Sequence, residues 1–184
     1  MADFIIENGV LIRYRGKKKA VKIPADVHTI GNYAFGGCEN LERIVIPSGV
    51  REIGEGVFMK CWYLQEVSIP DSVERVGFRA FADCKRLKSV SLGNGVNIIE
   101  PWTFDNCENL RSVTLGNGVR LIGDHAFYDC TSLAEIAIPD SVERIGRDAF
   151  AKCPHLTVFA AENGYAELYA LENDLDFQKK SDAE

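Results

Sequence analysis

Apolar residues recur along this chain at a constant step of 23 residues. Each unit places a phenylalanine, a cysteine three residues later and a leucine three residues after that. Such fixed columns predict a stack of similar units, each of which packs mainly against its neighbours. The phenylalanines are Phe35, Phe58, Phe81, Phe104, Phe127 and Phe150, the cysteines are Cys38, Cys61, Cys84, Cys107, Cys130 and Cys153, and the leucines are Leu41, Leu64, Leu87, Leu110, Leu133 and Leu156.

The polar and apolar positions inside one unit predict a strand, a turn and a short helical segment. Over Leu41–Ile46 the pattern alternates, so Ile44 and Ile46 should face inward and the residues between them outward. Pro47–Gly49 ends the strand as a turn. A short helical turn is expected over Val57–Cys61, before the chain returns to the next strand.

Both ends depart from the repeat. Phe4–Tyr14 predicts a β-hairpin around Asn8-Gly9, a favoured turn because both positions tolerate positive φ. Tyr165–Asn173 predicts a helix with Asn163 as its cap, followed by apolar residues that fold back on the core. We therefore expect a hairpin cap at 1–20, repeats at 21–159, a helical cap at 160–177 and a frayed tail at 178–184.

The strand pattern Leu-x-x-Ile-x-Ile follows Ile-Gly-x-x-Ala-Phe-x-x-Cys and precedes Ile-Pro-x-Ser. Together with the opening hairpin and the Gly164–Ala170 motif, it resembles the BspA-like class of leucine-rich repeats over roughly residues 4–177. The resemblance implies an α/β repeat solenoid: a right-handed leucine-rich-repeat stack with one parallel sheet face, an N-terminal hairpin cap and a C-terminal helical cap. Members are mostly bacterial and often displayed on cell surfaces, and some are adhesins that bind host matrix proteins such as fibronectin.

Charge narrows the range of partners. The net charge is −6, which argues against a general nucleic-acid binder. Residues 1–23 nevertheless hold six basic and two acidic side chains, so this segment is positive and the remainder strongly negative. No signal peptide and no apolar run of about 20 residues is recognisable, which predicts no membrane insertion and a cytoplasmic location. A bacterial cell-surface or secreted location is the alternative if the chain belongs to a longer protein.

The cysteines all fall in one column that should face the core. We expect buried free thiols there, because free cysteine packs as a small hydrophobe. Disulfides between adjacent coils remain an alternative, since stacked coils lie roughly 5 Å apart. The sequence has no Cys-x-x-Cys motif, so no metal site or other cofactor is predicted.

Motifs that would carry catalysis are missing from the sequence. It contains no Gly-x-Gly-x-x-Gly, P-loop or Gly-x-Ser-x-Gly. His28, His125 and His155 occupy different columns of the repeat. We therefore expect a non-catalytic protein.

Three surfaces are candidates for binding. The first is the outward side of the strands, a Ser/Thr-rich face that can form hydrogen bonds but also fits an ordinary solvated sheet surface. Its residues are Arg43, Val45, Glu66, Ser68, Ser89, Ser91, Ser112, Thr114, Glu135 and Ala137.

The second candidate surface is a set of aromatic residues that break the repeat columns. Exposed aromatic patches often mark interfaces, although these rings also fit local packing over the turns. They are Trp62, Tyr63, Phe78, Trp102 and Tyr128.

The third candidate is a basic patch near the N-terminus. It would attract an acidic partner or anionic polysaccharide, or simply protect the terminal strand from edge-to-edge pairing. Its residues are Arg13, Arg15, Lys17, Lys18, Lys19 and Lys22.

These surfaces lead to one functional prediction and two alternatives. The prediction is a binding module that engages a protein or glycan partner and is itself a monomer. The first alternative is a fragment of a bacterial cell-surface adhesin that binds a host matrix protein. The second is a structural or self-assembling scaffold.

Overall fold

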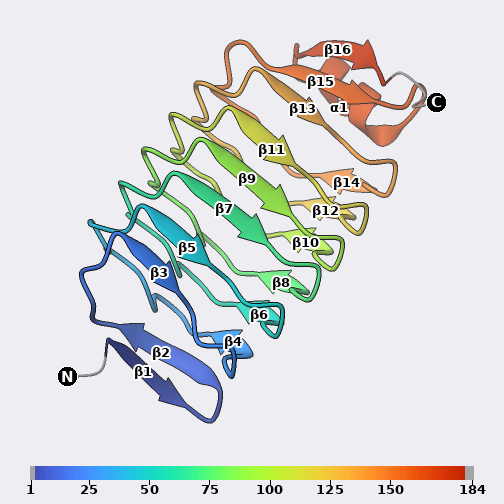
Figure 1. The fold of residues 1–184 in the computed structure, drawn as a ribbon. Helices are drawn as coiled ribbons and strands as arrows, with labels where there is room; N and C mark the ends of the chain where they lie inside the picture. Colours follow the sequence, from blue (N-terminus) through green and yellow to red (C-terminus); the bar gives the residue numbers. More distant parts are fainter. Residues whose placement is uncertain (1–2, 181–184) are drawn as a thin grey trace.

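The computed structural model describes residues 3–180 of the chain. The backbone winds into a solenoid whose coils stack along one axis, with a hairpin at one end and a helix at the other (Figure 1). The leucine-rich-repeat stack with its two caps, predicted from the sequence, is confirmed. The two termini lie at opposite ends of the solenoid (Figure 1).

The predicted strands form one long parallel face in two consecutive sheets. Inward residues such as Ile44 and Ile46 are buried, whereas Arg43 and Val45 are exposed, as the alternation predicts. The five-stranded sheet contains β3 (Ala20–Lys22), β5 (Arg43–Val45), β7 (Glu66–Ile69), β9 (Ser89–Leu92) and β11 (Ser112–Thr114). The three-stranded sheet contains β13 (Glu135–Ala137), β15 (Thr157–Ala160) and β16 (Asp176–Lys179).

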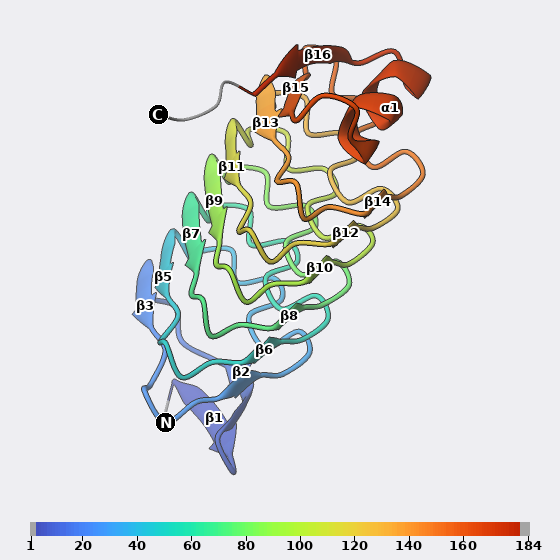
Figure 2. The same ribbon diagram turned by 90° about the vertical axis from the view of Figure 1, so that its right-hand side faces the viewer.

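A second sheet, which the sequence did not predict, runs along the other side of the solenoid (Figure 2). Most of its strands have two residues, which is too short for an alternating pattern to be visible. The N-terminal hairpin joins this sheet through β2, which pairs antiparallel with β1 and parallel with β4. The strands are β1 (Phe4–Glu7), β2 (Val10–Tyr14), β4 (Thr29–Ile30), β6 (Glu52–Ile53), β8 (Arg75–Val76), β10 (Ile98–Ile99), β12 (Leu121–Ile122) and β14 (Arg144–Ile145).

The helical turn expected over Val57–Cys61 is wrong: this segment is a series of turns. Its backbone N–H groups alternate between the next coil and their own: Met59 and Cys61 donate to carbonyls three residues earlier. The N–H of Phe35 donates to the carbonyl of Val57, and the N–H of Phe58 to that of Ala80, at 3.0 and 2.8 Å. Because every second N–H group bonds to the neighbouring coil, the consecutive bonds to residues four positions earlier that define an α-helix do not form.

Two columns of left-handed residues shape these turns. Residues 23 apart share φ angles of about +50° to +75°, a region that side chains other than glycine rarely adopt. The first column holds Tyr33, Gly56, Arg79, Trp102, His125 and Asp148. The second holds Gly37, Lys60, Asp83, Asn106, Asp129 and Lys152.

The phenylalanine column is the centre of the core. All six rings are buried, and consecutive rings stack with centroids 5.1–5.3 Å apart. The caps extend this stack: Tyr14 lies 5.0 Å from Phe35, and Tyr169 meets Phe150 edge-on at 6.1 Å. The core is thus one continuous aromatic column that both caps close.

The C-terminal cap is the helix α1 (Tyr165–Glu172), the only helix between residues 3 and 180. Its first cap position is Gly164, not Asn163 as expected. Leu175 and Phe177 pack against the core, which confirms that this segment folds back. No helix in the described part of the chain is long and apolar enough to cross a lipid bilayer.

The predicted frayed tail at 178–184 is wrong for its first residues. Gln178 and Lys179 belong to β16, and the N–H of Lys180 donates to the carbonyl of Ala160 at 2.9 Å. Backbone pairing with β15 holds this polar segment in place and needs no apolar side chains. The remaining residues of that prediction, 181–184, lie outside the described part of the chain.

Candidate binding surfaces

The strand face brings the predicted hydroxyl residues into register. In the parallel sheet Ser89 lies between Glu66 and Ser112, and Ser91 lies between Ser68 and Thr114. The hydroxyl of Ser91 donates to that of Ser68 at 3.0 Å. A short ladder of hydroxyl groups therefore runs across the middle strands.

Two adjoining hollows lie along this face. One, of about 400 Å³, extends from Arg43 and Glu66 to Ser112 and Thr114. The other, of about 380 Å³, starts at the same Ser112 and Thr114 and ends at residues of the last strands. All ten predicted residues of the strand face line one hollow or the other.

Sequence reasoning missed two residues of the second hollow, Phe159 and Lys180. Phe159 pairs in register with Ala137, only 22 residues earlier, so counting in steps of 23 places a different residue there. Lys180 follows β16, in the segment that was expected to fray. A search that allowed a one-residue slip in the last coil would have found Phe159.

The six cysteines are free thiols. Five are buried, as predicted, and each of these five thiols donates to the carbonyl of the phenylalanine 26 residues earlier at 3.1–3.3 Å. Burial raises the pKa of these thiols, to about 12 for Cys153. Cys38 differs because it is only half-buried, and burial raises its pKa while the positive charge of Arg13 lowers it. Within residues 3–180, no three potential metal ligands gather closely enough to hold an ion.

The predicted aromatic patch contains two separate sets of contacts. Around Trp102, the ring of His125 stacks in parallel at 4.1 Å, Tyr128 lies at 5.9 Å and the guanidinium of Arg79 at 5.4 Å. Arg79 also lies over Phe78, which is exposed. Neighbouring coils thus cover the faces of Trp102, an arrangement typical of local packing.

Trp62 and Tyr63 lie on a different turn, the one that leads into β7. Both are about two-fifths exposed, and the guanidinium of Arg86 lies 4.3 Å from the Tyr63 ring centroid. No ring contact among the described residues joins this pair to the Trp102 group.

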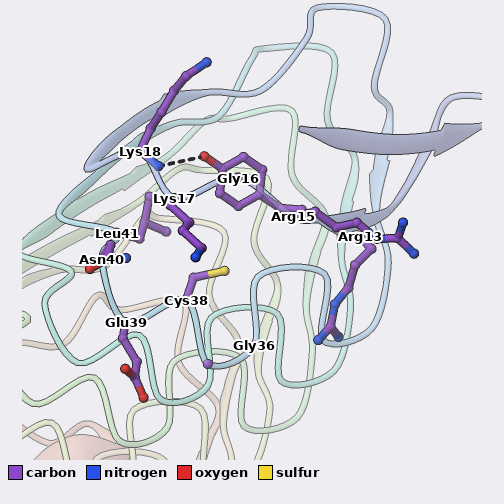
Figure 3. A pocket seen from close by; sticks show the side chains of 12 residues that line it. Arg13, Arg15, Gly16, Lys17, Lys18, Gly36, Cys38, Glu39, Asn40 and Leu41 are labelled. Carbon is purple, nitrogen blue, oxygen red and sulfur yellow. Dashed lines mark hydrogen bonds between the residues drawn. The ribbon is translucent and has the colours of Figure 1, made fainter. Parts of the chain in front are cut away.

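The basic patch surrounds a third hollow of about 280 Å³ at the N-terminal end (Figure 3). Arg13, Arg15, Lys17 and Lys18 line it, together with the turn that carries Cys38. The loop that follows the hairpin, residues 15–18, takes the place of the Cys-x-x-Leu turn of a preceding coil, and the hollow lies between this loop and the turn of the next coil.

The cations of the patch are not equivalent. Lys18 forms an ion pair with Asp3 at 2.9 Å, and Lys19 with Glu42 at 2.7 Å. Lys19 and Lys22 belong to the segment around β3 and do not line the hollow. The described residues offer no carboxylate within 4 Å of Arg15 or Lys17.

Comparison with known proteins decides the family. The model of the BspA-type leucine-rich repeat region, in six copies, matches residues 13–101 and 51–173. This chain belongs to the BspA-type leucine-rich repeat family. No curated protein matches the chain.

Solved structures of leucine-rich repeat proteins from bacteria have the same fold. A leucine-rich cell surface protein of Faecalibacterium prausnitzii is 29% identical with a TM-score of 0.70, over 85% of this chain and 52% of its own. A leucine-rich repeat protein of T. pallidum is 26% identical with a TM-score of 0.68, over 95% of this chain and 91% of its own. A protein of Eubacterium ventriosum is 28% identical with a TM-score of 0.61, over 82% and 50%. The chain thus spans about half the length of the first and third of these proteins.

Proposed function

We propose that this BspA-type repeat chain is a non-catalytic binding module that holds a protein or glycan partner against its strand face. The observation that carries the proposal is the pair of adjoining hollows along this face, lined by small hydroxyl side chains. Small side chains let a partner approach the backbone closely, and the hydroxyls both donate and accept hydrogen bonds. Stacked coils commonly use such an extended face for binding.

The sides of the hollows favour a protein over a glycan as the partner. Arg43 and Glu66 flank one end, and Glu135 and Lys180 flank the other. Charges of both signs fit a protein surface that also carries both signs, and they set its orientation. The apolar side chain of Phe159 adds a contact at the far end.

Adhesion at a bacterial surface is the second candidate. It is supported by the 29% identity with the Faecalibacterium prausnitzii protein, which is described as a cell surface protein. In that case the partner would be a protein of the surrounding matrix, and the strand face would still be the contact surface.

The test is a binding screen with a blocked strand face. We would immobilise purified matrix proteins, fibronectin among them, and a glycan array, and compare the natural chain with Ser91→Arg/Thr114→Arg. Two arginines in the hollows should abolish binding to the true partner. A matched variant with two arginines on the second sheet, Thr29→Arg/Ile98→Arg, adds the same two charges and should bind normally; these positions are partly or fully exposed. Binding that survives Ser91→Arg/Thr114→Arg would remove the strand face as the site.

A further inference from the structure

The two ends of the solenoid carry opposite charge. Residues 1–23 hold six basic and two acidic side chains, whereas residues 160–180 hold five acidic side chains and two lysines, Lys179 and Lys180. These segments form the N-terminal and C-terminal caps, which lie at opposite ends of the molecule (Figure 1). The solenoid is therefore a rod with a positive end and a negative end.

At the N-terminal end, Arg15 and Lys17 line the hollow without an ion pair to a described residue. Lys18 and Lys19 are neutralised by Asp3 and Glu42. Arg15 and Lys17 are exposed beside the 280 Å³ hollow, with no carboxylate among the described residues in ion-pair distance. Figure 3 shows Lys17, on the loop that follows the hairpin, close to Cys38 on the turn of the next coil.

The C-terminal end mirrors this arrangement with opposite sign. A hollow of about 280 Å³ is lined by Asp174 and Asp176 and by the turn that carries Cys153, which also contributes one cation, Lys152. Both aspartates are exposed, as is Glu172 at the end of α1. None of the three forms an ion pair with a described residue. Unpaired carboxylates at one end thus match unpaired cations at the other.

The outer face of α1 is apolar, which is unusual for a cap. Tyr165, Leu168 and Leu171 are 43%, 57% and 65% exposed, while Ala166, Tyr169 and Ala170 face the core. The terminal unit of a repeat stack normally turns a polar face to water. Three exposed apolar side chains on an eight-residue helix point to a surface that a partner covers.

We propose that the partner is a second copy of this chain, whose positive N-terminal cap docks on the negative C-terminal cap and covers the exposed face of α1. Charge complementarity selects this pairing, because two C-terminal caps would bring like charges together. Contact between different surfaces of identical molecules is open-ended, so the rods add end to end instead of closing into a dimer. The contact leaves the strand face free and does not depend on the proposed function.

The experiment exploits charge reversal at each end. Arg15→Glu/Lys17→Glu lowers the charge of residues 1–23 from +4 to 0 and replaces the two unpaired cations by carboxylates. Glu172→Lys/Asp174→Lys raises the charge of residues 160–180 from −3 to +1, so in either variant like charges meet at the contact. Sedimentation velocity over a range of concentrations at about 50 mM salt should show end-to-end association of the natural chain, which salt at about 500 mM suppresses. Each variant alone should associate at least about tenfold more weakly, since exposed ion pairs are replaced by repulsion.

The decisive measurement is the mixture of the two variants. Each now offers the end that the other needs, so mixing should restore association, and the chain that carries all four substitutions should associate by itself. Lys88→Glu/Arg111→Glu changes the net charge equally in the middle of the rod and should associate like the natural chain. Circular dichroism confirms that each variant is folded.

Three results would overturn the proposal. The first is a natural chain that stays monomeric at low salt up to high micromolar concentration. The second is association that the end variants do not weaken. The third is a closed dimer that does not grow with concentration, which would identify a self-complementary surface elsewhere.

Discussion

The thiol of Cys84 donates a hydrogen bond to the carbonyl oxygen of Phe58, 26 residues earlier and 3.1 Å away. The same carbonyl accepts the backbone N–H of Cys61 at 3.0 Å. The two columns that define the repeat in the sequence are thus joined directly in the structure, where a small polarisable side chain fills the space beside each aromatic ring.

Removing one such thiol should destabilise the fold. We expect Cys84→Ala to lower the free energy of unfolding by roughly 1–2 kcal/mol, because it leaves a small cavity and removes the S–H···O bond. Cys38→Ala is the matched control, since Cys38 is half-buried and its thiol donates to no carbonyl of the described residues. Equal losses in urea unfolding would show that the thiol bond and the buried position contribute nothing specific.

Alkaline pH should destabilise the molecule through the same column. Burial raises the pKa of five thiols above their ordinary value of 9.0, so the fold favours the protonated form. The stability that these protonated thiols contribute is fully present below pH 9. It is lost as the pH rises from 9 through the raised pKa values of the folded state. Each thiol should lower the free energy of unfolding by about 1.4 kcal/mol per pH unit above pH 9.

Chemical unfolding measured from pH 7 to 10.5 tests this dependence. In Cys84→Val, a variant with a similar side-chain volume, the free energy of unfolding should fall less steeply with pH. The difference in slope should correspond to about one bound proton. An unchanged slope would assign the alkaline loss to other groups.

The aromatic column predicts a large effect in a middle coil. Phe104 is fully buried between Phe81 and Phe127, with ring centroids 5.3 and 5.1 Å away. Phe104→Ala should reduce the free energy of unfolding by about 3–5 kcal/mol. Phe104→Leu, which keeps most of the apolar volume, should lose much less, and a nearly neutral Phe104→Ala would contradict the central place of this column.

Backbone strain at Lys60 offers a stabilising substitution. This exposed lysine adopts φ of +60°, a region that is unfavourable for residues with a Cβ atom. We expect Lys60→Gly to raise the free energy of unfolding by about 0.5–1 kcal/mol, since glycine adopts this conformation readily. Lys60→Ala keeps the Cβ and is the control; equal stabilities of the two variants would contradict the argument.

The two tryptophans should differ in their access to solvent. Trp62 is 42% exposed, whereas Trp102 stacks on His125 at 4.1 Å beneath Arg79. In the variant Trp102→Phe, the remaining Trp62 should emit at longer wavelength and be quenched strongly by iodide. In Trp62→Phe, the remaining Trp102 should be quenched weakly. Similar quenching of both would mean that the stack does not cover Trp102.

The core could be predicted because its residues are apolar and recur at fixed positions in the repeat. A phenylalanine every 23 residues has only one place in a stack of coils, the interior, and the cysteines and leucines at fixed offsets follow it there. The outward strand positions followed from alternation alone. The hollows along them did not, because a hollow depends on how side chains from several strands combine.

The left-handed turns could have been inferred but were not. Gly37, Asp83, Asn106 and Asp129 share a column, and these residue types tolerate positive φ better than most. Lys60 in the same column concealed the pattern, since lysine has no such preference. The helical interpretation of this segment came from its apolar spacing, which the bonds between coils override.

Hydrogen bonds from coil to coil, together with termini at opposite ends, also determine how the molecule responds to force. A pull on the two ends acts along the stack and loads the bonds of one terminal coil at a time. Each coil that detaches would release 23 residues, or about 80 Å of extended chain. A tethered copy under flow would therefore lengthen in equal steps and absorb mechanical work, while the coils that remain stacked keep their surface intact.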